Sequence, residues 1–273
     1  MKMKLRIIAA VILLPVLLIV LFLAPKVITA ILIGLVCAIS AYELMYRTGL
    51  VRHVRLVVYS VVAALLVPIW SFYGSIAVYG QIGTLAFFGL MFMEIMISHA
   101  KLKLSNITLS FFAGIILPYL LSSLARIMAM DIGRHVILVP FVAAFLSDSG
   151  AYFIGCRYGS HKLAPIISPN KSVEGLLGGL LFSVVGMLLY TLVMDLFVPC
   201  YVNYLYALIY GLLGSLAGVF GDLCFSAVKR QTGIKDYGNL IPGHGGALDR
   251  FDSMVTVAPL MEVMLTFIPL VVK

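Results

Sequence analysis

The sequence predicts an all-α, polytopic membrane protein: a bundle of about nine transmembrane helices with a cytoplasmic N-terminus. The mean hydropathy is +1.13, and 63% of the 273 residues are hydrophobic while 11% are charged. Soluble domains carry about 25% charged residues. Most of the chain consists of apolar blocks of about 20 residues, the length that a helix needs to cross a bilayer. The alternation of polar and apolar residues typical of a membrane β-barrel is absent from the sequence.

The apolar blocks give the expected spans in chain order. The first is too long for the apolar region of a usual signal peptide, so we expect it to remain as a membrane helix. The expected spans cover roughly residues 7–24, 27–45, 56–73, 76–97, 108–129, 136–156, 175–197, 203–225 and 253–272.

The distribution of Lys and Arg predicts the orientation. With the N-terminus inside, 15 of the 19 basic residues fall in cytoplasmic segments, as the positive-inside rule requires. Two polar loops, 157–174 and 226–252, then face the cytoplasm. We therefore expect an integral protein of the inner (plasma) membrane with a cytoplasmic active site. The net charge is +8, and the basic residues lie in short loops between the apolar blocks, which predicts contact with membrane lipid, not with nucleic acid.

The chain divides by chemistry into two regions. Residues 1–135 form nearly featureless transmembrane helices, for which internal packing, lipid contact and an oligomer interface (a homodimer) all stay open. Residues 136–273 contain both polar loops and are expected to form the catalytic region.

The segment 221–252 contains an unusual concentration of charge between two apolar runs. Its charged residues are Asp222, Lys229, Arg230, Lys235, Asp236, Asp249, Arg250 and Asp252, and it also contains the turn Pro-Gly-His-Gly-Gly. Membrane folding alone does not require such a segment, whereas binding of phosphate and metal would. A solvated loop with helix caps is the simpler alternative, but it explains neither the glycines nor the balanced charges.

Each residue type in this segment has a chemical use. The four bases can neutralise phosphates, and Gly245 and Gly246 let the backbone approach a ligand. Asp249 and Asp252 are three residues apart and are expected on one face of the last helix. With Asp222 they could bind a divalent ion such as Mg²⁺, which prefers one or two carboxylates, waters and substrate phosphates. His244 could contact phosphate, act as a general acid or fill the turn.

The eighth expected span presents glycines on one face. Gly211, Gly214, Gly218 and Gly221 share an arc of the helix, which favours close packing against other helices. Asp222 lies at the edge of that arc, and Ser226 follows one turn later. An acid in such a place points into the protein and indicates function by default.

The segment 148–175 is expected to form a second part of the site. Asp148 and Tyr152 share a helix face, and Asp148 could either join two helices by a hydrogen bond or serve the site. Ser172 is expected to cap the next helix, where Glu174 favours the helix dipole. Lys171 beside that helix start would suit a phosphate, and it follows the turn that begins at Ser168.

The segment 226–252 closely resembles the signature of the phosphatidate cytidylyltransferase (CDP-diacylglycerol synthase) family. It reads Ser226-Ala-Val-Lys229-Arg230, then Lys235-Asp236-Tyr-Gly238, then Ile241-Pro242-Gly243-His244-Gly245-Gly246-Ala247-Leu248-Asp249-Arg250-Phe251-Asp252. The residues Asp148-Ser-Gly-Ala-Tyr152 and Ser168-Pro169-Asn170-Lys171-Ser172 with Glu174-Gly175 resemble the family's second block. Two positions depart from the pattern: Phe225 replaces a usual acid, and Ala247 replaces a larger aliphatic residue.

The resemblance implies a reaction in which CTP and phosphatidate give CDP-diacylglycerol and pyrophosphate with Mg²⁺. It implies that Asp222, Asp249 and Asp252 bind the metal, while Asp148 orients a ligand or binds a second metal ion. The implied catalytic residues are the eight charged residues above and His244. The implied substrate-binding residues are Asp148, Tyr152, Ser168, Lys171, Glu174, Ser226, Gly245 and Gly246.

Two other classes stay open. A related CTP-dependent membrane enzyme could act on another lipid, as a CDP-archaeol synthase or a polyprenol kinase would. A transporter would also contain intramembrane acids, but it would more often show paired broken helices in two halves. No such internal symmetry is visible in this sequence.

Overall fold

The computed structural model describes residues 15, 18–74, 77–98, 102–240 and 245–272. Its internal contacts define two compact units: residues 1–130 with 234–251, and residues 131–233 with 252–273. Segment 234–251 therefore belongs with the N-terminal helices, whereas the sequence groups it with the catalytic region. The functional division at residue 135 stays a prediction. Most of the first expected span lies outside the described residues, and its described end, residues 18–23, is helical.

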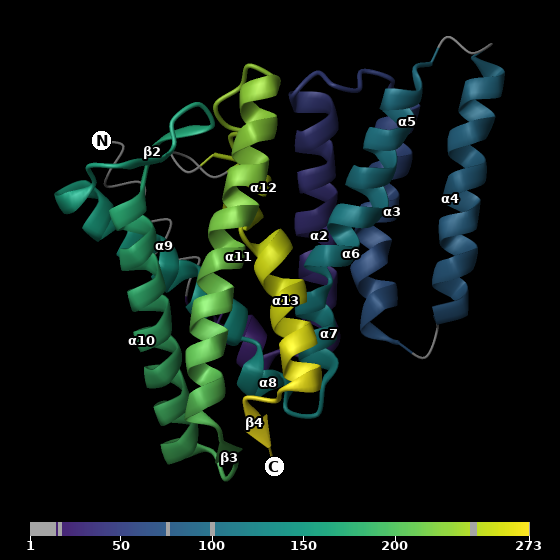
Figure 1. Cartoon of the computed structure of the whole chain (residues 1–273). Coiled ribbons are helices and arrows are strands. Elements are labelled where there is room, and N and C mark those ends of the chain that lie inside the picture. The colour runs from purple at the N-terminus through teal and green to yellow at the C-terminus, as the bar shows by residue number, and fades with distance from the viewer. Residues whose placement is uncertain (1–14, 16–17, 75–76, 99–101, 241–244, 273) are drawn as a thin grey trace. The chain divides into compact units, whose positions relative to one another are not determined.

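The first unit consists of helices. Its elements are α2 (Lys26–Tyr42), η1 (Glu43–Arg47), α3 (Val54–Phe72), α4 (Ala77–Ile97), α5 (Leu104–Phe111), η2 (Phe112–Ile116), α6 (Leu117–Leu121), α7 (Ser123–Ala129) and the short α12 (Leu248–Phe251). Helix α3 packs against α2 and α4, and α4 lies beside α3 in Figure 1. The segment η1 continues α2 as one turn of π-helix, in which the Thr48 N–H donates to the Glu43 carbonyl oxygen at 3.3 Å.

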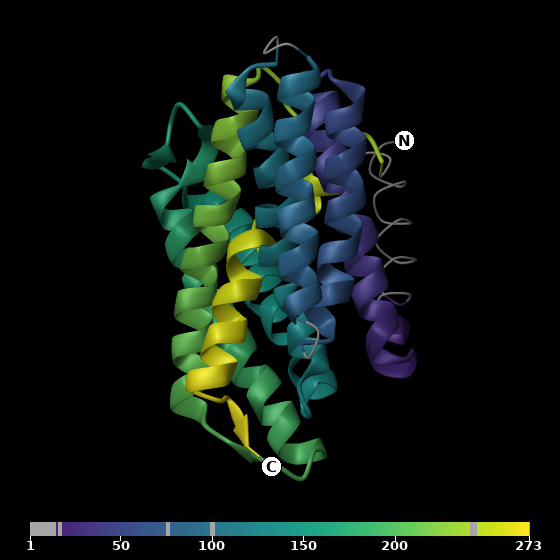
Figure 2. The same ribbon diagram turned by 90° about the vertical axis from the view of Figure 1, so that its right-hand side faces the viewer.

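The second unit combines long helices with short strands. Its elements are α8 (Gly133–Val136), α9 (Val139–Tyr158), β1 (Lys162–Ala164), β2 (Ser168–Ser172), α10 (Val173–Phe197), β3 (Tyr201–Val202), α11 (Tyr204–Gln231), α13 (Met254–Phe267) and β4 (Val271–Val272). Helix α10 packs against α9 and α11. Helix α13 runs beside α11 in both Figure 1 and Figure 2.

The described residues contain seven helices that are long and apolar enough to cross a membrane. They cover Lys26–Arg47, Val54–Phe72, Val78–Ile97, Leu104–Ala129, Gly133–Tyr158, Val173–Phe197 and Tyr204–Gln231. The second to eighth expected spans are thus confirmed as helices, with boundaries shifted by a few residues. The last expected span, 253–272, is shorter in the structure, because α13 ends at Phe267 and strand β4 follows.

The expected loop 157–174 contains a β-hairpin. Strands β1 and β2 are antiparallel, and Lys162 pairs with Ser172 while Ala164 pairs with Ser168. Ser172 then caps α10, because its hydroxyl oxygen accepts from the Gly175 N–H at 3.1 Å. The predicted cap is confirmed, and the hairpin fixes Lys171 next to the start of α10.

Glycines let the helices of the second unit approach closely. A Cβ on Gly150 of α9 would lie 2.6 Å from the Gly178 carbonyl oxygen of α10. On α11, a Cβ on Gly214 would lie 2.7 Å from the Ala143 Cβ, and one on Gly221 would lie 2.8 Å from the Asp252 carbonyl oxygen. The packing role predicted for the α11 glycines is therefore confirmed, since only small residues permit such approach.

Candidate active site

A cavity of about 280 Å³ in the second unit is lined by several polar residues of the 148–175 segment. Helix α9, the hairpin and helices α10 and α11 all contribute to its wall. The lining residues are Asp148, Ala151, Tyr152, Leu163, Ser168, Asn170, Lys171, Ser172, Gly175, Leu176 and Val219. Four predicted substrate-binding residues, Asp148, Tyr152, Ser168 and Lys171, thus line one cavity. The mixture of charged, hydroxyl and apolar groups suits an amphiphilic ligand.

An ion pair joins the hairpin to helix α11. The Lys171 ammonium contacts the Asp222 carboxylate, and these side chains are 24% and 27% exposed. The other Asp222 oxygen accepts from the Ser226 hydroxyl at 3.2 Å, one helical turn further along α11. The sequence predicted the proximity of Asp222 and Ser226 from their spacing, and the structure adds Lys171 as the counter-charge.

A second ion pair lies deeper, with Lys229 Nζ 3.7 Å from Asp252 Oδ2 and both side chains little more than a tenth exposed. The Ser253 N–H donates to the other carboxylate oxygen of Asp252 at 2.9 Å. Burial, and then the negative charges of Asp222 and Asp148, raise the pKa of Asp252 to about 7, although Lys229 opposes this shift. A carboxyl with such a pKa lies in a place where additional positive charge would be stabilising.

Two further polar residues of the second unit, Arg230 and Glu174, hold the hairpin. The Arg230 Nε–H donates to the Ile167 carbonyl oxygen at 3.1 Å, which ties the end of α11 to the hairpin turn. The Glu174 carboxylate accepts from the Ser160 N–H at 3.1 Å and lies 2.6 Å from His161 Nδ1. Glu174 therefore fixes the entry to β1, whereas the sequence assigned it only to the helix dipole and to substrate binding.

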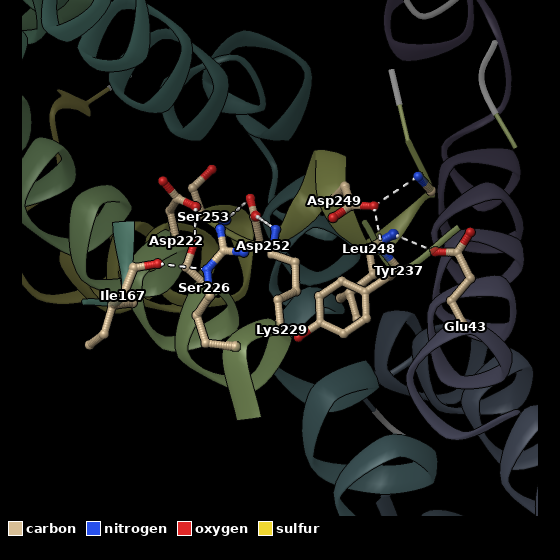
Figure 3. A network of polar contacts seen from close by, with 12 residues as sticks. Glu43, Ile167, Asp222, Ser226, Lys229, Tyr237, Leu248, Asp249, Asp252 and Ser253 are labelled. Atoms are coloured by element: carbon tan, nitrogen blue, oxygen red, sulfur yellow. Dashed lines mark hydrogen bonds and ion pairs between the residues drawn. The ribbon is translucent and has the colours of Figure 1, made fainter. Parts of the chain in front are cut away.

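In the first unit, Asp249 organises the signature loop. Its Oδ2 accepts from the Tyr237 N–H at 2.8 Å and from the Gly246 N–H at 2.9 Å. Gly245 has a φ of +87°, a backbone conformation that favours glycine. Two backbone N–H groups of the loop thus donate to one carboxylate, and Figure 3 shows Tyr237 beside Asp249.

Asp249 and Asp252 do not lie on one helix face, so this expectation was wrong. Helix α12 ends at Phe251 and α13 begins at Met254, which leaves Asp252 in the turn between them. Lys235, Asp236 and Arg250 are exposed. His244 and Gly243 lie outside the described residues.

Sequence reasoning missed Glu43. This carboxylate is only 3% exposed, and it accepts from the Ala247 N–H at 3.1 Å through Oε1 and from the Leu248 N–H at 3.0 Å through Oε2. Both donors belong to the signature segment, and Figure 3 shows Leu248 beside Glu43. The available signal was an acid inside the expected second span, because an intramembrane carboxylate indicates function by default.

The carboxylates of the second unit fit a divalent ion that arrives with a phosphate ligand. Within the described ranges, no three His, Cys, Asp or Glu side chains gather to hold a metal by themselves. Asp222 and Asp252 are nevertheless close enough for the charge of one to raise the pKa of the other. Mg²⁺ commonly binds through one or two carboxylates, with waters and substrate phosphates completing its shell.

A larger cavity, of about 420 Å³, lies in the first unit between α3 and α4. Its lining is almost wholly apolar and includes Tyr59, Trp70, Gly83 and Phe87. No Asp, Glu, Lys or Arg contributes to that lining. The smaller cavity of the second unit is therefore the better candidate for phosphate chemistry.

Comparison with known proteins decides the family. The sequence profile of the cytidylyltransferase family matches residues 4–268. The chain belongs to the cytidylyltransferase family. This membership confirms the resemblance seen in the 148–175 and 226–252 segments.

Several relatives of this chain are similar to it over part of their length. A Staphylococcus epidermidis protein named phosphatidate cytidylyltransferase is 46% identical over 133 residues, which is 49% of this chain and 50% of the relative. Proteins of the same name from Staphylococcus saprophyticus and Staphylococcus aureus are each 47% identical over 133 residues. The matched part thus spans about half the length of each of these relatives.

Proposed function

We propose that this protein is a phosphatidate cytidylyltransferase, which makes CDP-diacylglycerol and pyrophosphate from CTP and phosphatidate. The observation that carries the proposal is the cavity lined by Asp148, Tyr152, Ser168 and Lys171, the last of which is paired with Asp222 of α11. Family membership and the names of the relatives support the same reaction. A phosphate nucleophile is already anionic at neutral pH, so the site needs charge neutralisation more than a strong base.

In the proposed reaction, a phosphate oxygen of phosphatidate attacks the α-phosphorus of CTP. A new phosphorus–oxygen bond forms, and the bond from the α-phosphorus to the bridging oxygen of the β-phosphate breaks. Pyrophosphate leaves with that electron pair. Both reactants are anions, so the residues around them must offset the repulsion between them.

Cationic side chains of the second unit can offset the repulsion between the two anionic reactants. Lys171 lines the cavity and can exchange its carboxylate partner for a phosphate oxygen, while Lys229 is held by Asp252 at the end of α11. Arg230 adds a guanidinium at the same helix end. The signature is the basis for the proposed catalytic roles of Lys235, Asp236, His244, Asp249 and Arg250. It is also the basis for the proposed substrate-binding roles of Gly245 and Gly246.

Asp222 and Asp252 would hold Mg²⁺, with Asp249 as the third predicted ligand. When bound, the ion supplies positive charge to the phosphates and to the leaving pyrophosphate. Asp222 already receives a hydrogen bond from Ser226, which keeps its carboxylate oriented along α11. The elevated pKa of Asp252 supports a cation there, because positive charge favours the ionised carboxylate.

We further propose nine spans with the N-terminus and both polar loops in the cytoplasm of a plasma membrane. Seven long apolar helices among the described residues support a polytopic arrangement. The bias of Lys and Arg toward the same segments supports the orientation. CTP would then enter from the cytosol, while the phosphatidate headgroup lies at the inner interface.

The test is synthesis by the purified full-length protein in detergent or lipid nanodiscs, with radiolabelled CTP, phosphatidate and MgCl₂. Both CDP-diacylglycerol and pyrophosphate are expected in equal amounts. Asp222→Asn should lower kcat by about 100-fold or more, as loss of a transition-state charge contact does. The matched control is Asp195→Asn, because Asp195 is an exposed acid near the end of α10 whose carboxylate accepts from the Tyr204 hydroxyl at 2.9 Å. Pyrophosphate release without lipid product would sink the proposal.

A further inference from the structure

The carboxylate of Glu43 and the amides of residues 247 and 248 form a contact between segments about two hundred positions apart. Oε1 accepts from Ala247 and Oε2 accepts from Leu248, at 3.1 and 3.0 Å. All three residues are buried within the first unit. Each carboxylate oxygen is thus used by one amide at the start of α12, directly before Asp249 and Arg250.

Burial gives this contact its strength. A carboxylate removed from water is costly unless its oxygens accept hydrogen bonds, and a buried N–H without an acceptor is costly as well. Charge-assisted hydrogen bonds satisfy both requirements at once. The amides of 247 and 248 begin a short helix, where N–H groups have no acceptor within the helix. Glu43 supplies acceptors from another part of the chain.

The signature segment leaves room for this carboxylate. A Cβ on Gly238 or on Gly246 would collide with Oε1 of Glu43. Both glycines are buried and neither has the positive φ that Gly245 shows. Their small size is therefore explained by the approach of Glu43, while at Gly245 the backbone conformation itself favours glycine.

The backbone at Glu43 is itself irregular. Residues Glu43–Arg47 form a π-helical turn at the end of α2, and π-turns occur frequently at functional sites. The chain then turns back, and the Val51 N–H donates to the Met45 carbonyl oxygen at 3.0 Å. The Glu43 carboxylate consequently extends from a helix end that is held by the π-helical turn and by the hydrogen bond from Val51.

We infer that Glu43 is a positioning residue for the proposed cytidylyl transfer. Its carboxylate fixes the start of α12, so that Asp249 and Arg250 are held in the geometry that the reaction needs. Glu43 does not touch substrate in this assignment. The inference rests on the proposed function for its effect on catalysis, whereas the anchoring of the loop can be measured without any substrate.

The experiment compares Glu43→Gln with Glu94→Gln in the full-length protein in nanodiscs. Glu94 is a matched control, because it is also a buried acid of the first unit, 5% exposed. It is bound to Tyr59 at 3.2 Å and to Arg55 at 3.6 Å instead of to the signature loop. Gln at 43 keeps the shape but offers one acceptor oxygen and places an NH₂ group against the second amide.

Two readouts are expected to change in Glu43→Gln. Hydrogen–deuterium exchange should rise in peptides covering 245–251, while peptides from 54–72 keep the wild-type rate. The kcat for CDP-diacylglycerol synthesis should fall by about 10- to 100-fold, the range for a lost hydrogen bond to a charged group. KM for CTP should change less than kcat, because positioning acts on the transition state. Glu94→Gln should leave both the loop exchange and this kcat near the wild-type values.

Three outcomes would overturn the inference: unchanged exchange across 245–251, an unchanged kcat, or equal kcat losses in the two variants. If Glu43→Gln does not fold, Glu43→Asp keeps the charge on a shorter side chain, and wild-type exchange in its loop would count equally against the anchor. A wild-type protein that makes no CDP-diacylglycerol contradicts the proposed function instead. The exchange comparison then still decides whether Glu43 holds the loop.

Discussion

Lys171, the penultimate residue of strand β2, forms an ion pair with Asp222 of helix α11. The two residues belong to different sequence motifs, and the cavity wall includes Lys171 directly. This pair links the 148–175 segment to α11 just before the signature segment, and the hydrogen bond from Arg230 to Ile167 is a second link.

Replacement of Lys171 tests the cavity as a phosphate site. Lys171→Met keeps much of the side-chain length but removes the charge, so we expect kcat/KM to fall by about 10- to 100-fold through loss of a charged hydrogen bond. Steady-state kinetics with varied phosphatidate and varied CTP will show which substrate is affected more. Lys162→Met, at an exposed position in β1 of the same hairpin, is the control and should stay near wild type. Equal kinetics in both variants would exclude the cavity as the reacting site.

The stability of metal-free protein should depend on pH through Asp252. Its pKa is raised from 3.8 to about 7 in the folded protein, so the folded state binds more protons than the unfolded state between these values. Stability therefore falls as pH rises from about 4 to 7 and is lowest above 7. The contribution is at most about 4 kcal/mol, since one pKa unit corresponds to about 1.4 kcal/mol.

Thermal unfolding in EDTA at pH 5, 6, 7 and 8 measures this effect. The Tm of wild type should drop more across the series than the Tm of Asp252→Asn, which has no carboxyl to ionise. Parallel curves for the two proteins would mean that Asp252 keeps an ordinary pKa.

Asp249 has a structural contact that complicates its predicted role as a metal ligand. Asp249→Asn keeps one oxygen for the Tyr237 and Gly246 amides but removes the charge. If Asp249 binds Mg²⁺, the variant should lose activity and need more Mg²⁺ for half-maximal rate. Titration of activity with MgCl₂ tests this, and an unaltered Mg²⁺ requirement with retained activity contradicts the ligand assignment.

The helix packing in the second unit predicts a cost for any side chain at Gly150. Its Cβ would lie 2.6 Å from a carbonyl oxygen of α10, and backbone cannot move aside as a side chain can. Gly150→Ala should therefore destabilise the protein by about 1–3 kcal/mol, as overpacking does. Gly83→Ala is the control, because a Cβ there meets nothing within 4 Å. A Tm drop for Gly150→Ala no larger than that for Gly83→Ala would contradict the close contact of α9 and α10.

The elements that the sequence predicted well depend on local pattern. Apolar blocks identify the seven long helices, the spacing of Asp222 and Ser226 predicts their proximity, and Ser172 is a recognisable cap. Each of these needs only neighbouring residues on one helix. The charged residues of the signature could likewise be named as candidates from their concentration in one segment.

The elements that the sequence did not predict depend on partners far apart in the chain. Glu43 satisfies amides near residue 247, and no local pattern indicates which acid will do so. The β1–β2 hairpin lacks an alternating pattern, and the break between α12 and α13 separates Asp249 from Asp252 despite their helical spacing. The hydrogen bond from the Gly246 N–H to Asp249 was not predicted either, because the sequence indicated only that the backbone at Gly246 could approach a ligand.

The pairing of Lys171 with Asp222 also bears on which anions the cavity accepts. Because each charge offsets the other, we expect the pair by itself to attract inorganic phosphate only weakly. An anion that bound Lys171 without an accompanying cation would separate the Asp222 carboxylate from its ion-pair partner. An anion accompanied by its own cation gives both residues a new partner. In the proposed reaction, this pair would therefore favour a nucleotide that arrives with its divalent cation over a bare nucleotide.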